Sequence, residues 1–290
     1  MAKIADLLAA GRTFSFEFFP PKTDQAARAL EKTVAELAEL EPSFVSVTYG
    51  ALGTTREPTR DLVIAINREQ PFPAMPHLTC VGHTRAQLRE LLAEYHGAGI
   101  ENILALAGDP PADGSESGGD FAYATELVEL VREAGDFGVA VAAFPEIHPR
   151  SPDRETDRRF LAAKLQLADF GMAQFFFEVD HFLRMRDELD ALGCTTPLLP
   201  GVMPFISVSG TRRMAGVNGT EIPVALDRRL DHVDADTDPE AVRRLGVEVA
   251  SELCARLLAE GVAGLHLYSM NRSSSVREIY ANLGLGPAGG

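Results

Sequence analysis

The sequence predicts a single (β/α)8 barrel that follows a short N-terminal helix. Along its 290 residues, apolar strand-like runs alternate with helical patterns eight times, and strict alternation indicates a parallel sheet covered by helices. The length suits one closed barrel, which typically takes about 250 residues. The first strand is followed by Phe-Phe-Pro-Pro and not by the glycine fingerprint of an open dinucleotide-binding sheet. We therefore expect residues 1–12 to form a helix and residues 13–290 to form one barrel domain.

The first strand is expected around the stretch Ser15–Pro21, which ends at two prolines because proline has no N–H to continue a sheet ladder. Phenylalanines at 14, 16 and 18 alternate with polar residues, so one face of the strand is aromatic and the other polar. Glu17 therefore stands near the carboxyl end of the strand. Burial among aromatic side chains would favour its protonated form. The alternative is a carboxylate that points to solvent or pairs with Lys22.

The remaining elements follow from periodicity and from residues that start or stop helices. The helix over 24–40 has apolar side chains on one face from Ala27 to Leu40, and Asp24 suits its N-cap. The long helix over 239–260 has a proline in its first turn. We expect a mobile polar loop over 112–120, a helical turn over 211–216 and an irregular acidic segment over 221–238. The other predicted helices are 59–68, 85–96, 122–134, 154–167, 179–192 and 276–283, and the other strands are 44–48, 75–81, 102–107, 139–144, 172–177, 197–203 and 264–268.

Composition limits the classes of partner. The chain has 27 Lys and Arg against 42 Asp and Glu, a net charge of −15, which argues against general binding to nucleic acid or to an anionic membrane. A local cluster of basic residues could still hold an anionic small molecule. No run approaches the ~18 apolar residues of a membrane span, and the N-terminus is a poor signal peptide. Three scattered cysteines without a CxxC pair suit a reducing compartment, so we expect a cytoplasmic protein. The oligomeric state stays open.

The chemistry of a barrel lies at the carboxyl ends of its strands. Metal binding by the histidines there is disfavoured, because no HxH or HExxH spacing occurs and ordinary hydrogen bonding is commoner. No GxSxG nucleophile is present, and a phosphate site has support only from Ser207–Gly210, after the seventh strand. We therefore predict no metal site. The polar residues at the predicted strand ends are Glu17, Thr48, Tyr49, His77, Thr79, Asp109, Glu146, His148, Gln174, Glu178, His266, Tyr268, Asn271 and Arg272.

Glu17 and Asp109 form a possible pair of carboxylates on separate strands. Two acids in different surroundings can divide the work, one protonated and one ionised. Glu17 would be the acid, and Asp109, which follows Gly108 in a tight turn, would stay charged. The alternative for Asp109 is a turn-forming residue in Gly-Asp-Pro, and the spacing alone does not decide between them.

At this point the residues resemble the methylenetetrahydrofolate reductase family, from about Phe14 to Leu283. Each shared motif is short, but their order and spacing together are specific. The resemblance implies a (β/α)8 barrel that reduces 5,10-methylenetetrahydrofolate with NADH or NADPH, normally through bound FAD. The motifs are Ser-Phe-Glu-Phe-Phe-Pro-Pro at 15–21, Phe-Val-Ser-Val-Thr-Tyr-Gly at 44–50, Pro-His-Leu-Thr-Cys at 76–80, Gly-Asp-Pro-Pro at 108–111, Ala-Ala-Phe-Pro-Glu-Ile-His-Pro at 142–149, Gln-Phe-Phe-Phe at 174–177, Leu-Pro-Gly at 199–201 and Tyr-Ser-Met-Asn-Arg at 268–272.

The resemblance also implies roles for individual residues. Glu17 would be the general acid that opens the imidazolidine ring to a 5-iminium cation, which accepts the hydride. Asp109 would contact the pterin and tune the flavin, Gln174 would be a second pterin ligand, and Arg272 would contact the substrate, at its anionic glutamate tail. The residues at positions where the family contacts FAD are Thr48, His77, Tyr123, Ala124, His148, Asp157 and Lys164.

Several positions depart from the family pattern. Ala107 replaces an arginine, Phe144 a tyrosine, Ala173 a threonine and Gly210 a glutamine that follows the seventh strand, and the segment 165–171 is shortened. An FAD pyrophosphate without its arginine loses a bidentate, charge-assisted contact. We therefore hypothesise that FAD binding is weakened or absent and that NADH gives its hydride directly to the iminium carbon. The alternative is ordinary catalysis, in which the hydride passes through bound FAD.

Two rival functions belong to other classes. A non-catalytic barrel that binds folate would also tolerate the loss of flavin contacts, but it has no need of a proton donor such as Glu17. A metal-dependent barrel lyase would contain bound zinc or manganese. The sequence leaves open the choice between NADH and NADPH and the length of glutamate tail accepted.

Overall fold

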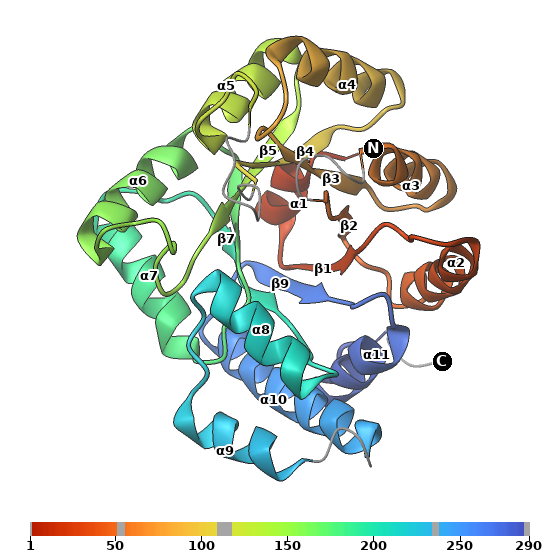
Figure 1. Cartoon of the computed structure of the whole chain (residues 1–290), viewed down its shortest axis with the longest axis vertical. Coiled ribbons are helices and arrows are strands. Elements are labelled where there is room, and N and C mark those ends of the chain that lie inside the picture. Colours follow the sequence, from red (N-terminus) through yellow and green to blue (C-terminus); the bar gives the residue numbers. More distant parts are fainter. Residues whose placement is uncertain (1, 51–55, 109–117, 234–237, 287–290) are drawn as a thin grey trace.

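The computed structural model describes residues 2–50, 56–108, 118–233 and 238–286. Within these ranges the strands form one sheet in which every pair of neighbours is parallel, in the order β7-β6-β5-β4-β3-β2-β1-β9-β8. The sheet curls into a ring (Figure 1), and its two end strands, β7 and β8, are joined through Pro200 alone. The strands are β1 (Thr13–Phe18), β2 (Phe44–Val47), β3 (Ala74–Thr79), β4 (Asn102–Leu106), β5 (Gly138–Ala143), β6 (Phe170–Ala173), β7 (Leu198–Leu199), β8 (Gly201–Val202) and β9 (Gly264–Tyr268).

The two shortest strands together occupy the seventh place in the barrel. The sequence predicts one strand over 197–203, and the structure divides it at Pro200 into β7 and β8. Pro200 has no N–H to donate, but its carbonyl accepts a hydrogen bond from the His266 amide at 3.0 Å. Because β7 pairs with β6 and β8 pairs with β9, the short strands close the ring. The predicted (β/α)8 barrel is confirmed.

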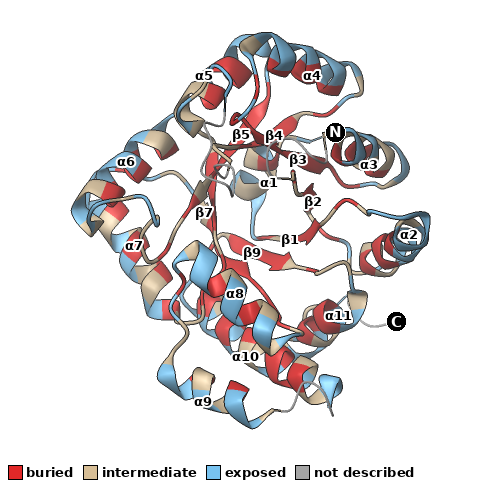
Figure 2. Ribbon diagram, viewed as in Figure 1, coloured by how far each residue is buried: buried red, intermediate tan, exposed pale blue. Residues whose placement is uncertain are grey.

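Helices surround the sheet, and Figure 2 shows their buried residues turned toward it and their exposed residues turned outward. The predicted turn over 211–216 is a longer helix, α8, whose N-terminus is capped by Ser207. The acidic segment over 221–238, for which the sequence allows either irregular structure or a helix, contains α9. The helices are α1 (Ile4–Ala10), α2 (Asp24–Ala38), α3 (Arg56–Glu69), α4 (Arg85–Gly97), α5 (Ala124–Ala134), α6 (Arg154–Gln166), α7 (Val179–Ala191), α8 (Val208–Asn218), α9 (Val224–His232), α10 (Pro239–Ala259) and α11 (Ser273–Asn282).

Two local predictions are wrong. The N-cap of α2 is Thr23, whose hydroxyl accepts from the Ala26 amide, and not Asp24. The sixth strand ends at Ala173, whereas the sequence predicts that it continues to 177. Phe175 and Phe176 beyond it are still fully buried, so an apolar run marked burial here and not strand conformation.

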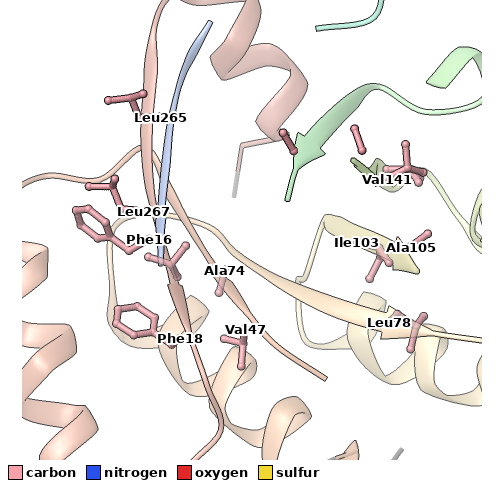
Figure 3. Close-up of a cluster of buried hydrophobic side chains, with 14 of the residues drawn as sticks. Phe16, Phe18, Val47, Ala74, Leu78, Ile103, Ala105, Val141, Leu265 and Leu267 are labelled. Carbon is pink, nitrogen blue, oxygen red and sulfur yellow. The ribbon is translucent and has the colours of Figure 1, made fainter. Parts of the chain in front are cut away.

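The core has two layers because strand side chains alternate between faces. The outer layer fills the space between strands and helices, and Figure 3 shows Phe16 and Phe18 of β1 there near Val47 and Leu267. The inner layer lies inside the barrel. It consists of Phe44, Met75, Leu104, Ala140, Phe170, Met172 and Leu199, packed around Ile4 of α1.

The N-terminal helix closes the end of the barrel at which the strands begin. Ile4 is fully buried in the inner layer, and its amide donates to Asn102 Oδ1 at 2.8 Å. The side-chain nitrogen of Asn102, Nδ2, donates to the Ala2 carbonyl at 3.1 Å. The buried asparagine at the start of β4 therefore holds the helix in place. The division into a helix (1–12) and one barrel domain (13–290) stays a prediction.

None of the helices within the described ranges is long and apolar enough to cross a membrane.

Replacing Ile4 with Ala should lower the free energy of unfolding by about 2–4 kcal/mol, because the truncated side chain leaves a cavity in the inner layer. Urea denaturation followed by circular dichroism measures the change. The exposed Val224 of α9 serves as a control, and Val224→Ala should change stability by less than about 0.5 kcal/mol. Equal effects of the two substitutions on stability would contradict the role of α1 in packing Ile4 into the inner layer.

Candidate active site

The carboxyl end of β1 places Glu17 inside the barrel. Phe16 and Phe18 point to the outer layer, so the alternating residues Ser15 and Glu17 point inward. Glu17 is only 4% exposed. The predicted face and position of Glu17 agree with the structure, but its expected aromatic surroundings do not. The phenylalanines of β1 lie on the other side of the sheet, and imidazoles face the carboxyl group instead.

Two histidines approach the same oxygen of Glu17. His77 Nε2 lies 3.4 Å and His266 Nε2 3.5 Å from Glu17 Oε2. The Ser46 hydroxyl lies between the rings, 3.3 Å from His77 Nε2 and 3.4 Å from His266 Nε2. His266 Nδ1 is 2.8 Å from the Ser15 hydroxyl. These five residues, from β1, β2, β3 and β9, form one buried polar cluster in the barrel mouth.

Burial lowers the pKa of His77 from 6.5 to about 4. The nearby Glu17 carboxyl group raises this pKa and His266 lowers it, but loss of hydration is the largest effect. His77 is therefore neutral near pH 7 and places no full positive charge beside Glu17.

Gln174 and Tyr268 meet in the mouth, next to this cluster. Tyr268 lies directly opposite Glu17 in the parallel pairing of β9 with β1. Its hydroxyl donates to Gln174 Oε1 at 2.7 Å. Burial raises the pKa of Tyr268 well above its usual value, and the neighbouring Glu17 adds to this, so the hydroxyl keeps its proton.

The segment after β9 holds the end of β1. The Ser269 hydroxyl and amide both donate to the Glu17 carbonyl, at 2.5 and 3.2 Å. The Asn271 side chain forms two hydrogen bonds with the Phe19 backbone, each at 2.8 Å. Its Oδ1 accepts from the Phe19 amide and its Nδ2 donates to the Phe19 carbonyl. Asn271 has a φ of +54°, a region that asparagine tolerates better than most residues. The backbone around Glu17 is therefore fixed from the opposite end of the chain.

Arg272 and Asp109 are the other residues expected to contact the substrate. Arg272 is exposed at the start of α11, where its amide donates to the Ser269 carbonyl. It lies three residues beyond Ser269, at the rim of the mouth. Asp109, expected as a second carboxylate, lies outside the described residues.

The residues expected to contact FAD are spread over the carboxyl side of the barrel. Thr48 follows β2, and its amide donates to the Phe18 carbonyl. Tyr123 and Ala124 begin α5, and the Tyr123 side chain is 70% exposed. His77 belongs to the cluster around Glu17 and is not a separate feature of a flavin surface.

The three remaining expected FAD contacts are engaged within the protein. Asp157 Oδ1 accepts from the His148 amide and the Ser151 hydroxyl, and Oδ2 pairs with Arg158 at 2.5 Å. The Lys164 ammonium donates to the Ala142 carbonyl at 2.7 Å. Burial lowers the pKa of Lys164 to about 8, and Asp157 partly opposes this. The His148 ring packs edge-on against Phe144, with centroids 4.6 Å apart.

Sequence reasoning missed Arg158, which organises the loop after β5. This guanidinium is almost fully buried on α6 and donates to the carbonyls of Phe144, Pro145 and Glu146. It also pairs with Glu188 at 2.7 Å. A single arginine in a polar helix gives no sequence signal of burial. Ser46 was also missed, although its position between Phe44 and Thr48 on one strand face could have shown that it points inward.

Two of the departures from the family pattern do not face the mouth. Ala173 is buried in the outer layer, among side chains that face the helices. The shortened segment 165–171 joins the end of α6 to the start of β6, at the opposite end of the barrel. Ala107 and Phe144 directly follow the carboxyl ends of β4 and β5, whereas Ala173 ends β6 but packs toward the helices.

Among the described residues, no three His, Cys, Asp or Glu side chains are grouped so as to hold a metal ion.

Comparison with known proteins identifies the family. The model of the family described as methylenetetrahydrofolate reductase matches residues 3–284. The chain belongs to this family. It is 36% identical to 5,10-methylenetetrahydrofolate reductase of Pectobacterium carotovorum, over 94% of this chain and 90% of that protein. It is 35% identical to the Escherichia coli enzyme of the same name, over 94% of this chain and 91% of that protein.

A plant relative and two solved structures extend the comparison. Methylenetetrahydrofolate reductase (NADH) 1 of Arabidopsis thaliana is 36% identical over 98% of this chain, which spans 50% of the plant protein. An uncharacterised protein from Clostridium thermocellum that binds two copies of 5-methyl-5,6,7,8-tetrahydrofolic acid matches with a TM-score of 0.63 at 14% identity, covering 97% of each chain. A mutant tryptophan synthase α-subunit from Pyrococcus furiosus matches with a TM-score of 0.55 at 14% identity, covering 94% of this chain and 99% of that one. At these identities the two structures show a shared barrel fold.

Among the positions at which FAD contacts are expected, two side chains are already engaged within the protein, and two departures remove polar groups. Methylenetetrahydrofolate reductases generally use FAD, yet here Asp157 and Lys164 are engaged with neighbouring protein groups. Ala107 and Phe144 carry no charged or polar side-chain group with which to hold a diphosphate.

The buried neutral histidine predicts a pH dependence of stability. The unfolded chain protonates His77 below about pH 6.5, whereas the folded chain resists protonation down to about pH 4. Stability should therefore be full above this window and should fall as pH falls through it, by at most about 1.4 kcal/mol per pH unit. Wild type should lose about 1–2 kcal/mol more than His77→Asn between about pH 7.5 and 5, measured by urea denaturation. Parallel losses would show that His77 is not held neutral.

Proposed function

We propose that the chain reduces 5,10-methylenetetrahydrofolate to 5-methyltetrahydrofolate with a reduced nicotinamide cofactor as hydride donor. Family membership supports the reaction, and relatives that share 35–36% of their residues over 94% of this chain carry the name of this enzyme. The observation that carries the proposal is Glu17, a buried carboxyl group at the carboxyl end of a barrel strand. Enzymes built on this barrel place their chemistry at this end.

Glu17 would act as the general acid. Its proton passes to N10 of the folate, the bond between N10 and the bridging methylene carbon breaks, and a 5-iminium cation forms. Hydride addition to that carbon then gives the 5-methyl group, and Glu17 regains a proton from solvent. The geometry suits this role because Ser269 and Asn271 fix the backbone of β1, and because His77 is neutral beside the acid.

Polar groups around Glu17 would hold the folate. Gln174, which accepts a hydrogen bond from Tyr268 beside Glu17, would contact the pterin ring. The exposed Arg272 would meet the anionic glutamate tail. Asp109 remains a proposal from the resemblance alone, as a further pterin contact.

The hydride would pass directly from NADH to the iminium carbon. Support comes from the engaged side chains of Asp157 and Lys164 and from the departures at Ala107 and Phe144. NADH is the donor named for the plant relative, and NADPH is the alternative. The three cysteines are unpaired and buried, which supports a reducing, cytoplasmic setting.

Replacing Glu17 with Gln should reduce turnover by at least about 100-fold, since the amide keeps the shape of the side chain but cannot act as the acid. The assay is oxidation of NADH that depends on methylenetetrahydrofolate. The surface substitution Glu133→Gln serves as the matched control, because Glu133 pairs with Arg89 on the helix surface far from the mouth. Circular dichroism should show both variants folded. Near-normal turnover by Glu17→Gln would remove the acid assignment.

The purified protein should be colourless and active without added FAD. An absorption spectrum from the near-ultraviolet to the visible, followed by denaturation and analysis of the supernatant, measures any bound flavin. Direct transfer predicts stereospecific movement of deuterium from labelled NADH to the methyl product. A yellow protein that releases stoichiometric FAD would overturn direct transfer, although it would leave the proposed reaction intact.

The NADH-oxidation assay also tests the rival class, a barrel that binds folate without reducing it. Tight binding of methylenetetrahydrofolate without NADH oxidation would favour a binding protein. Elemental analysis tests the remaining rival, a metal-dependent lyase, which requires bound zinc or manganese.

A further inference from the structure

The side-chain amide of Gln174 has a defined orientation. Two groups approach its oxygen: the Tyr268 hydroxyl at 2.7 Å and the Phe175 amide at 3.2 Å. A backbone N–H can only donate, so the atom that it meets must be the amide oxygen and not the nitrogen. The two bonds together therefore orient the Gln174 amide.

This orientation leaves the amide nitrogen available to a ligand. Within the described part of the chain, Gln174 Nε2 has no hydrogen-bond partner, and it is not among the buried side-chain atoms that lack one. Gln174 follows β6 on the inward face, in alternation with Phe170 and Met172 of the inner layer. The open Nε2–H groups thus belong to a side chain that faces the barrel mouth.

We propose that Tyr268 is a positioning residue that holds the Gln174 amide so that its nitrogen donates to an acceptor atom of the bound pterin. The inference rests on the proposed function and adds which partner donates. Gln174 would donate to a ring nitrogen or carbonyl of the pterin and would not accept from an N–H or NH₂ group. A pterin ring carries donors and acceptors on its edges, so an amide held in one orientation selects one placement of the ring. An amide that rotates freely would allow more than one placement of the ring.

The position of Tyr268 is itself strongly constrained. Register with Glu17 fixes its height on β9. Its ring packs edge-on against Phe175, at 6.2 Å between centroids, and against His266, at 5.7 Å. Gly201 leaves the space for it, since a Cβ there would lie 3.0 Å from the Tyr268 ring and 2.2 Å from the Ala173 carbonyl. The hydroxyl therefore reaches Gln174 from a fixed direction.

A double-mutant cycle tests the proposal. The measured quantity is the dissociation constant for 5-methyltetrahydrofolate, by isothermal titration calorimetry on the full chain without nicotinamide. Tyr268→Phe should weaken binding about tenfold, because the amide loses the stronger of the two bonds that orient it. Gln174→Glu should weaken binding about 100-fold, because a carboxylate can still accept from Tyr268 and Phe175 but has no hydrogen to donate.

The decisive comparison is Tyr268→Phe in the Gln174→Glu background. Because the Gln174→Glu side chain has no donor to orient, adding Tyr268→Phe to it should change the affinity for 5-methyltetrahydrofolate by less than about twofold. If Tyr268 acts only through packing, the same roughly tenfold loss should appear in both backgrounds, and the proposal is then wrong. Unchanged affinity in Tyr268→Phe alone would overturn it as well.

A matched control is Tyr95→Phe, which removes another buried tyrosine hydroxyl, one without a hydrogen-bond partner among the described residues and located on α4. This variant should bind 5-methyltetrahydrofolate as wild type does. The wild-type titration separates the two levels of inference. Absence of folate binding by wild type would defeat the proposed function, whereas normal binding with an additive cycle would defeat only the role of Tyr268.

Discussion

The parallel pairing of β1 with β9 is the contact on which the rest of the structure depends. It joins residues about 250 positions apart in the sequence, from Thr13 opposite Gly264 to Glu17 opposite Tyr268. This pairing closes the ring of strands and places His266 and Tyr268 beside Glu17. It also brings Ser269 and Asn271 onto the backbone that follows Glu17. One register therefore decides both the closure of the barrel and the geometry of its mouth.

A polar cluster inside a barrel is costly unless its members satisfy one another. His77 and His266 approach the Glu17 carboxyl group, and Ser15 and Ser46 in turn contact these histidines, so the cluster supplies contacts that water would otherwise supply. The inner layer beneath them is apolar and includes Ile4 of α1. The protein thus separates a structural end, where α1 packs, from a chemical end, where Glu17 and Gln174 face the ligand.

The comparison of the FAD positions shows why residue identity alone is a weak guide to a cofactor. Asp157 and Lys164 are the residue types that the family has at these positions, yet both are engaged in contacts with Ser151 and Ala142. Conversely, the departure at Ala173 suggested a change at the flavin, but its side chain lies in the helix-facing core. Side-chain direction and existing partners, which depend on the fold, determine what a residue can offer to a ligand.

Periodicity by itself determined the alternation of strands and helices, the inward direction of Glu17 and the order of the motifs around it. These features are local, because the pleat of a strand and the turn of a helix repeat over a few residues. The sequence could not show that histidines from β3 and β9, and not the neighbouring phenylalanines, face Glu17. It also could not show that Arg158 is buried, that Pro200 divides the seventh strand, or that Tyr268 orients Gln174. Only the tertiary structure decided these points, because each depends on register and packing between segments that are distant in the chain.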